Sequence, residues 1–180
     1  MASRRPNATV SQVLIACAVL LVPVVLIYLW FSRVPDPTPR PVDWQPVVTL
    51  AKAEAPYPVA VPENLPEGWT VVRARWTPAG EPGLNQQPAV GDTLQLGYLT
   101  PDQVYLGLDQ RSTDPKGLIA DASRATTADG ESELAGVSWQ RYVSDDRRSR
   151  ALVRSDEQST LVISGDLPYE ALEAFAGTLA

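Results

Sequence analysis

Histidine is absent from the 180 residues of this chain, and its only cysteine is Cys17. Without histidine, the chain cannot build a Ser-His-Asp triad or a histidine-ligated metal site. With one cysteine, it can form no internal disulfide and no cysteine-ligated metal cluster. We therefore predict no metal site and no cofactor, and the sequence identifies no catalytic residue.

Charged side chains are missing from the whole stretch between Arg5 and Arg33. Residues 10–31 are almost wholly apolar, and 22 helical residues at ~1.5 Å each span roughly 33 Å, enough to cross a hydrocarbon core of about 30 Å. Aromatic side chains at the C-terminal end, Tyr28 and Trp30, suit the headgroup layer of a bilayer. Residues 10–31 are therefore predicted to be a transmembrane helix.

Three other interpretations of the apolar stretch fit less well. A buried core helix seldom has about 18 or more apolar residues without a charge. A cleaved signal peptide has an apolar region of about 7–15 residues and then a small-x-small site, whereas Ser32-Arg33-Val34-Pro35 follows here. A lipoprotein box at Leu14-Ile15-Ala16-Cys17 is unlike the usual one, because the apolar residues continue for 14 positions after the cysteine. We predict an uncleaved signal anchor.

The basic residues beside the apolar stretch are almost balanced between its two ends. Arg4 and Arg5 precede it, while Arg33 and Arg40 follow it. The positive-inside rule alone is therefore close to a tie, and the short basic head before the first span favours a cytoplasmic N-terminus. We predict a single-pass protein of the cell membrane, with residues 1–9 as a cytoplasmic head and the C-terminal domain outside.

Prolines at every second position from 35 to 41 follow the apolar stretch. This alternation favours polyproline II, so residues 32–43 are predicted to be a semi-rigid stalk. Residues 44–180 are long enough for one domain with its own core. From residue 34 onward the chain carries 12 Arg and Lys against 21 Asp and Glu, a net charge of −9, which argues against nucleic acid as a partner.

Alternating apolar side chains predict strands in the C-terminal domain. Three strands are predicted with their inward faces: Thr70–Thr77 (Val72, Ala74, Trp76), Thr93–Leu99 (Leu94, Leu96, Tyr98) and Gln103–Gln110 (Val104, Leu106, Leu108). Three more are predicted at 137–144, 149–154 and 160–164. Short connections such as Thr100-Pro101-Asp102 favour antiparallel neighbours. Segments 80–91 and 126–133 are predicted to be flexible loops.

Three helices are predicted in the same domain, the last of them from apolar residues at helical spacing. They cover Val48–Ala55, Pro115–Ala122 and Pro168–Thr178. Pro168 suits the first turn of the last helix, and Glu170 suits the positive end of its dipole. The predicted fold class is α+β: one N-terminal transmembrane helix, then a mostly antiparallel sheet with a C-terminal helix packed on one face.

Tryptophan offers the first candidate site outside the membrane. Trp76 and Trp139 lie on predicted strands and are expected in the core. Trp44 lies at the end of the stalk and Trp69 beside a turn, and these two could line a surface groove. The charged run Asp145–Arg148 is expected to be a solvated turn. Paired carboxylates could catalyse hydrolysis, but such pairs meet only in space, and the sequence singles out none of its 21 acidic residues.

Several short segments also carry a family resemblance. They are the basic head with its single span, Val61–Trp69, Leu96–Pro101, Trp139–Tyr142 and Leu161–Gly165. Together they resemble an actinobacterial family of unknown function, made of small single-pass membrane proteins. The resemblance implies a membrane-anchored outer domain, and it supplies no activity and no functional residues.

These observations favour a membrane-anchored extracytoplasmic domain that binds an envelope protein or a cell-wall component without catalysis. Such a module should expose an apolar or aromatic patch. One alternative is a sensor or regulator that signals through its single span, although a head of nine residues offers little to signal with. A less favoured alternative is an envelope hydrolase with two carboxylates of shifted acidity in a deep cleft.

Overall fold

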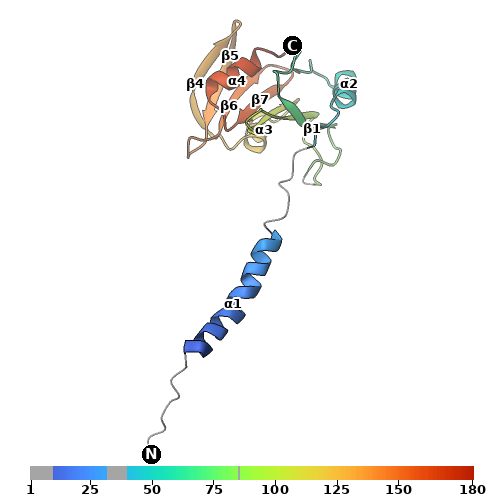
Figure 1. Ribbon diagram of the computed structural model, residues 1–180. Helices are drawn as coiled ribbons and strands as arrows, with labels where there is room; N and C mark the ends of the chain where they lie inside the picture. Colours follow the sequence, from blue (N-terminus) through green and yellow to red (C-terminus); the bar gives the residue numbers. More distant parts are fainter. Residues whose placement is uncertain (1–9, 32–39, 85) are drawn as a thin grey trace, which may run out of the picture. The chain divides into compact units, whose positions relative to one another are not determined.

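The computed structural model describes residues 10–31, 40–84 and 86–180 (Figure 1). The chain divides into two compact units, Met1–Pro39 and Arg40–Ala180, and each is described by itself. The predicted cytoplasmic head, residues 1–9, lies outside the described residues. So does the part of the predicted stalk between residues 32 and 39.

The first unit contains helix α1, Val10–Phe31, as the apolar stretch predicts. Its segment Gln12–Trp30 is long and apolar enough to cross a membrane, and none of it is buried against other parts of the chain. Among the described residues it is the one helix with these properties. Helix α1 is therefore a candidate membrane anchor.

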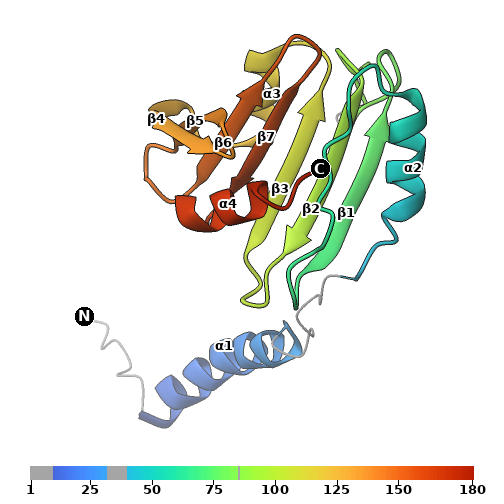
Figure 2. The ribbon, with the colours of Figure 1, turned by 90° about the horizontal axis from the view of Figure 1, so that it is seen from above.

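The second unit is built on one seven-stranded antiparallel sheet in the order β1-β2-β3-β7-β6-β5-β4 (Figure 2). Its strands are β1 (Thr70–Thr77), β2 (Thr93–Leu99), β3 (Tyr105–Arg111), β4 (Thr127–Leu134), β5 (Val137–Val143), β6 (Arg150–Ser155) and β7 (Thr160–Gly165). The predicted α+β class with an antiparallel sheet is confirmed.

Alternation along the strands sends one set of apolar side chains to a main core. Leu96, Leu108 and Ile163 are completely or almost completely buried there. Helix α4 (Tyr169–Ala176) covers this face with Leu172 and Phe175, as predicted for the C-terminal helix. The rest of the face is covered by the extended segment 57–61 and by α2 (Gln45–Glu54), which packs beside β1 (Figure 2).

The opposite face of the sheet has a smaller core under helix α3, Pro115–Ala122. Leu118 of this helix packs on Val153 of β6 and Val162 of β7, both side chains that alternate with the main-core residues. Helix α3 contacts β3 and β7, and no described helix covers the same face over β1 and β2. A ligand site can therefore form on this face of β1 and β2.

Segment 126–133 was predicted to be a flexible loop, and this prediction is wrong. Residues 127–134 form the edge strand β4, paired with β5 and followed by a two-residue turn at Ala135-Gly136 with φ of 51° and 79°. The strand lacks an apolar alternation because most of its side chains are exposed. Gly130, at φ +94°, lies within a bulge that also interrupts the two-residue alternation of the strand.

Two finer predictions also need correction. Val72 was expected to point inward with Ala74 and Trp76, but a β-bulge between Val71 and Arg73 shifts the register and buries Val71 instead. Helix α2 begins at Gln45, three residues before the predicted start, because Pro46 is pre-organised for the first turn. The other predicted strands and helices agree with the structure to within two residues at almost every end.

The hydroxyl of Tyr98 is buried in the main core and has no hydrogen-bond partner among the described residues. The ring itself packs on Phe175 with centroids 5.1 Å apart. Tyr98→Phe keeps this packing and removes an unsatisfied polar group, so we expect it to raise the free energy of unfolding by about 1 kcal/mol. Urea unfolding measures the difference, and a loss of stability would show that the hydroxyl is bonded in solution.

Candidate functional site

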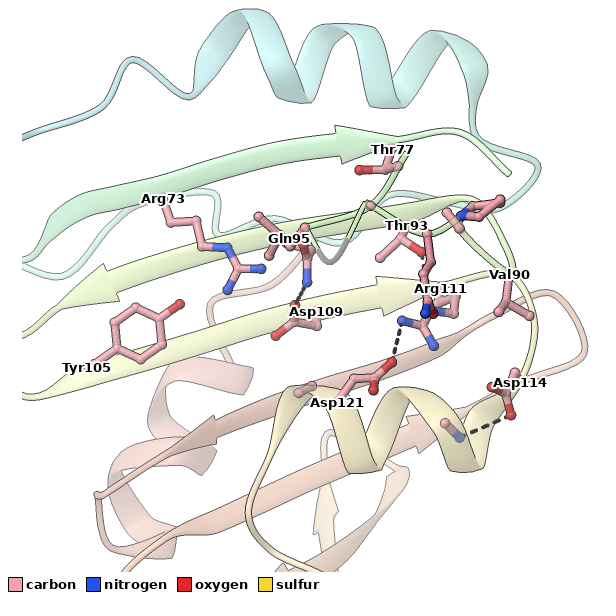
Figure 3. Close-up of a pocket in the computed structure, with 17 residues that line it drawn as sticks. Arg73, Thr77, Val90, Thr93, Gln95, Tyr105, Asp109, Arg111, Asp114 and Asp121 are labelled. Carbon is pink, nitrogen blue, oxygen red and sulfur yellow. Dashed lines mark hydrogen bonds and ion pairs between the residues drawn. The ribbon is translucent and has the colours of Figure 1, made fainter. Parts of the chain in front are cut away.

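A cavity of about 510 Å³ lies over β1, β2 and β3, on the face away from the main core (Figure 3). Helix α3 forms one wall, with Asp121 and Ala122, and the described residues 83–84 and 87–90 form another. Its volume lies within the range of small-molecule sites, roughly 300–1,000 Å³.

The floor of the cavity is supplied by the strand positions that alternate with the main-core residues. Arg73 on β1, Gln95 on β2 and Asp109 on β3 all point to this face (Figure 3). Because neighbouring side chains of a strand point to opposite faces, the same register that buries Leu96 and Leu108 brings these polar groups together. The floor is thus a consequence of the sheet register.

Asp109 is the most buried ionisable group of the floor, with 4 % of its surface exposed. The amide nitrogen of Gln95 donates a hydrogen bond of 2.9 Å to its Oδ1. Burial raises the pKa of Asp109 to about 6, and the nearby guanidinium of Arg73 opposes this rise. A carboxyl group of this kind changes its protonation near neutral pH.

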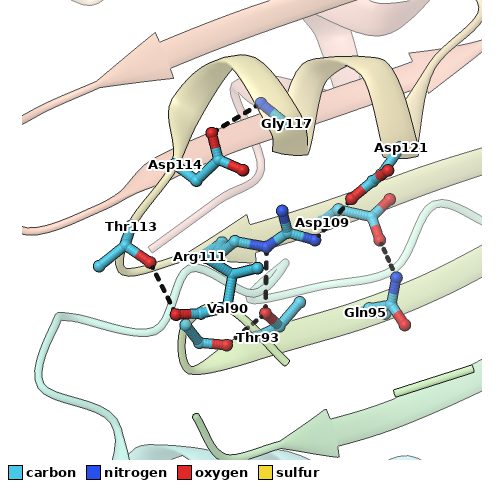
Figure 4. A network of polar contacts seen from close by, with 10 residues as sticks. Val90, Thr93, Gln95, Asp109, Arg111, Thr113, Asp114, Gly117 and Asp121 are labelled. Atoms are coloured by element: carbon cyan, nitrogen blue, oxygen red, sulfur yellow. Dashed lines mark hydrogen bonds and ion pairs between the residues drawn. The ribbon is translucent and has the colours of Figure 1, made fainter. Parts of the chain in front are cut away.

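Two arginines reach the cavity, and they differ in how they are held. Arg111 donates from Nε to Thr93 at 3.2 Å and from Nη2 to Asp121 at 3.0 Å (Figure 4). The Arg73 side chain extends toward Gln95 and Asp109, yet its guanidinium forms no hydrogen bond or ion pair within the described parts of the chain (Figure 3). Arg73 is therefore available to an incoming anionic or acceptor group.

Tyr105 forms the end of the floor, and two glycines make room for its ring. Gly97 and Gly107 lie directly opposite each other on β2 and β3. A Cβ at Gly97 would lie 2.5 Å from the Tyr105 hydroxyl, and one at Gly107 would lie 3.5 Å from the ring. The ring thus covers the glycine pair and leaves an aromatic surface, 42 % of the residue being exposed.

The rim of the cavity is apolar where the 80–91 segment passes. Arg75 fixes this segment by donating from Nη2 to the Pro82 carbonyl at 2.7 Å. Thr113 holds its far end through a 3.2 Å hydrogen bond to the Val90 carbonyl (Figure 4). Leu84 and Val90 are 62 % and 67 % exposed although they line the cavity. The site therefore combines a charged floor with an apolar rim.

The other acidic groups of the site are already engaged. Asp121 is paired with Arg111, and Asp114 accepts a hydrogen bond from the Gly117 amide as the N-cap of α3. Asp109 also has one oxygen bonded, to Gln95, but it differs from the other two acids in being almost completely buried, and it forms no ion pair within the described residues. In the described ranges, no three Cys, Asp or Glu side chains are grouped so as to hold a metal ion.

The tryptophans predicted to line a groove lie elsewhere in the domain. Trp44 precedes α2 and is half-buried against the main core. Trp69 stacks on Phe175 with ring centroids 5.5 Å apart and planes 10° apart. Neither residue lines the cavity over β1–β3. A second hollow lies along α2 and is lined by the two neighbours of Trp44 in the sequence, Asp43 and Gln45, and by Leu50.

Other sequence-based expectations about side chains agree with the structure. Trp139 is buried, and Trp76 packs against the main core. Asp145–Arg148 form an exposed turn between β5 and β6. Sequence reasoning missed Arg73 and Asp109, although both stand at alternate positions of strands that were predicted correctly.

Comparison with known proteins gives one family and a distant structural neighbour. The sequence profile of a family described as "Protein of unknown function (DUF4245)" matches residues 5–179. No curated protein sequence matches the chain. Among solved structures, a chain of the complex structure of Pseudomonas aeruginosa MucA/MucB aligns with 14 % identity and a TM-score of 0.35. The alignment covers 67 % of this chain and 34 % of that one, so this chain spans about a third of its length.

Proposed function

We propose that this chain, which belongs to the family described as "Protein of unknown function (DUF4245)", is a membrane-anchored binding module. Helix α1 holds it in the cell membrane, and the sheet domain faces the outside of the cell. The cavity over β1–β3 takes the ligand. The observation that carries this proposal is the buried carboxylate of Asp109 facing the uncommitted guanidinium of Arg73 inside one cavity.

Binding explains two features of the cavity better than an ordinary solvated sheet face does. Such a face keeps its charges in water, whereas Asp109 is almost completely buried. Burying a carboxylate costs free energy unless something compensates it. Leu84 and Val90 are exposed at the rim, and exposed apolar side chains around a polar site are typical of a surface that a partner covers. We infer that a bound ligand supplies both the compensation and the cover.

The cavity can be tested for a natural ligand with a photoreactive amino acid at the rim. Replacement of Leu84 by a benzophenone side chain should give a covalent adduct on irradiation of native membranes. Intact-mass spectrometry of the purified chain measures the adduct. Leu50 is the matched control, since it is also an exposed leucine but lies on α2 outside the cavity. An equal yield of adduct at both positions would contradict a ligand in the cavity.

The proposed orientation is testable because the native cysteine lies inside α1. In a Cys17→Ser background, Leu50→Cys should react with a membrane-impermeant maleimide in intact cells, since the Leu50 side chain is exposed. Ala2→Cys, in the predicted cytoplasmic head, should react only after lysis. The opposite labelling pattern would place the sheet domain in the cytoplasm and overturn the orientation.

A further inference from the structure

The structure points to a small zwitterion as the ligand: we propose that the cavity binds an α-amino acid or short peptide with an apolar side chain. Its carboxylate pairs with Arg73, its ammonium pairs with Asp109, and its side chain lies against the rim. This inference rests on the proposed function and adds the chemical class of the ligand.

The two charged groups of the floor set the first requirement. Arg73 and Asp109 influence each other electrostatically, yet no ion pair within 4.0 Å joins them among the described residues. Each group therefore retains bonding capacity inside the same cavity. A guanidinium offers a planar fork that matches a carboxylate, and a carboxylate accepts hydrogen bonds from an ammonium.

The second requirement is that the ligand carries both charges. A purely anionic ligand would bring its charge beside Asp109, and a purely cationic one would bring its charge beside Arg73. Either ligand would leave one of these two charged side chains without a partner in a poorly hydrated cavity. A zwitterion compensates both groups and adds no net charge to the cavity.

The contacts of Asp109 leave room for an ammonium group. Gln95 occupies Oδ1 at 2.9 Å, and no hydrogen bond from a described residue reaches Oδ2. A Cβ at Gly107 would lie 3.3 Å from Oδ2, so the lack of a side chain there leaves this oxygen unobstructed on that side. The carboxylate is thus held in place at one oxygen by Gln95, and its other oxygen keeps its hydrogen-bonding capacity.

The third requirement concerns the uncharged part of the ligand. The cavity of about 510 Å³ exceeds what a charged head alone would fill. The remaining lining includes Leu84, Val90 and the ring of Tyr105, which offer apolar and aromatic contact. An aliphatic side chain on the zwitterion would bury these exposed groups. The transfer of this apolar surface out of water would stabilise the complex.

The test measures binding of L-leucine and L-leucyl-L-leucine to the full-length chain in lipid nanodiscs by titration calorimetry. N-acetyl-L-leucine lacks the ammonium and L-leucinamide lacks the carboxylate, so each probes one half of the recognition. At least one zwitterion should bind, and its one-charge derivatives should bind at least tenfold more weakly. Arg73→Gln should weaken the zwitterion at least tenfold, and so should Asp109→Asn. The matched controls Arg148→Gln and Asp145→Asn, in an exposed turn, should leave binding unchanged.

Three results would overturn the proposal. Equal binding of N-acetyl-L-leucine would indicate a site for simple anions, and binding of a neutral sugar such as trehalose in place of the zwitterions would indicate a site for hydroxyl groups. Absence of binding by either zwitterion would reject the ligand class. In each case a Leu84-specific adduct in native membranes would still support a binding module, so failure of the ligand class is distinguishable from failure of the proposed function.

Discussion

The variant Asp109→Asn is expected to raise the free energy of unfolding by about 2 kcal/mol at pH 8 and to leave it almost unchanged at pH 4. Burial places the pKa of Asp109 at about 6 in the folded chain, against an ordinary value of 3.8. A shift of this size is equivalent to about 2–3 kcal/mol. Asparagine keeps an oxygen for the Gln95 hydrogen bond of 2.9 Å and carries no charge.

The direction of the effect follows from proton binding. Between about pH 4 and pH 6 the folded chain holds a proton on Asp109 that the unfolded chain has lost. Wild-type stability should therefore fall as the pH rises through this window and stay level above it. Charged and polar groups facing the carboxylate include Arg73, Gln95, Arg111 and Asp121, and the two arginines limit the rise in pKa.

The pH dependence separates this prediction from a general effect on stability. Urea unfolding in mild detergent, followed by tryptophan fluorescence at pH 4, 6 and 8, measures it. Asp145→Asn is the matched control, because that carboxylate lies in the exposed turn between β5 and β6, away from Asp109, so no gain at pH 8 is expected. A stability gain for Asp109→Asn that is equal at pH 4 and pH 8 would contradict a raised pKa. A gain at pH 8 with reduced ligand binding would be typical of a functional group kept at a cost in stability.

Truncation of one aromatic side chain should have the largest effect on folding. Phe175→Ala is expected to lower the free energy of unfolding by about 3–5 kcal/mol, the usual cost of removing a buried phenyl ring. Phe175 is 1 % exposed and packs on two rings, Trp69 at 5.5 Å and Tyr98 at 5.1 Å. Its removal leaves a hole where α4 meets the main core.

The same unfolding assay measures this loss, and Leu84→Ala provides the comparison. Leu84 is mostly exposed at the cavity rim, so its truncation should change stability by less than about 0.5 kcal/mol. A cost below about 1 kcal/mol for Phe175→Ala would mean that α4 can repack without its phenyl ring. Such a result would also weaken the assignment of Trp69 as part of this aromatic cluster.

Much of the fold follows from local patterns along the chain. The apolar stretch predicts α1, alternation predicts the inward faces of β2 and β3, and short connections predict their antiparallel pairing. Each of these patterns reflects whether a side chain faces water, lipid or the protein core, so it can be recognised from residues that are close together in the sequence. The edge strand β4 lacks such a signal, because most of its side chains are exposed and the one buried position is a polar residue, Ser132, bonded to Glu173 of α4.

By itself, the sequence determined the candidate membrane anchor, the α+β class and the exclusion of histidine and cysteine chemistry. Only the tertiary structure decided where the polar residues of the strands meet. Arg73 and Asp109 are 36 positions apart in the sequence, and they share a cavity because β1, β2 and β3 pair in one register. Burial raises the pKa of Asp109, and the cavity around it is lined by residues of α3 and of the segment before β2, which are not neighbours of Asp109 along the chain. Alternation can tell which face of a strand a residue occupies, but what covers that face depends on packing between distant segments.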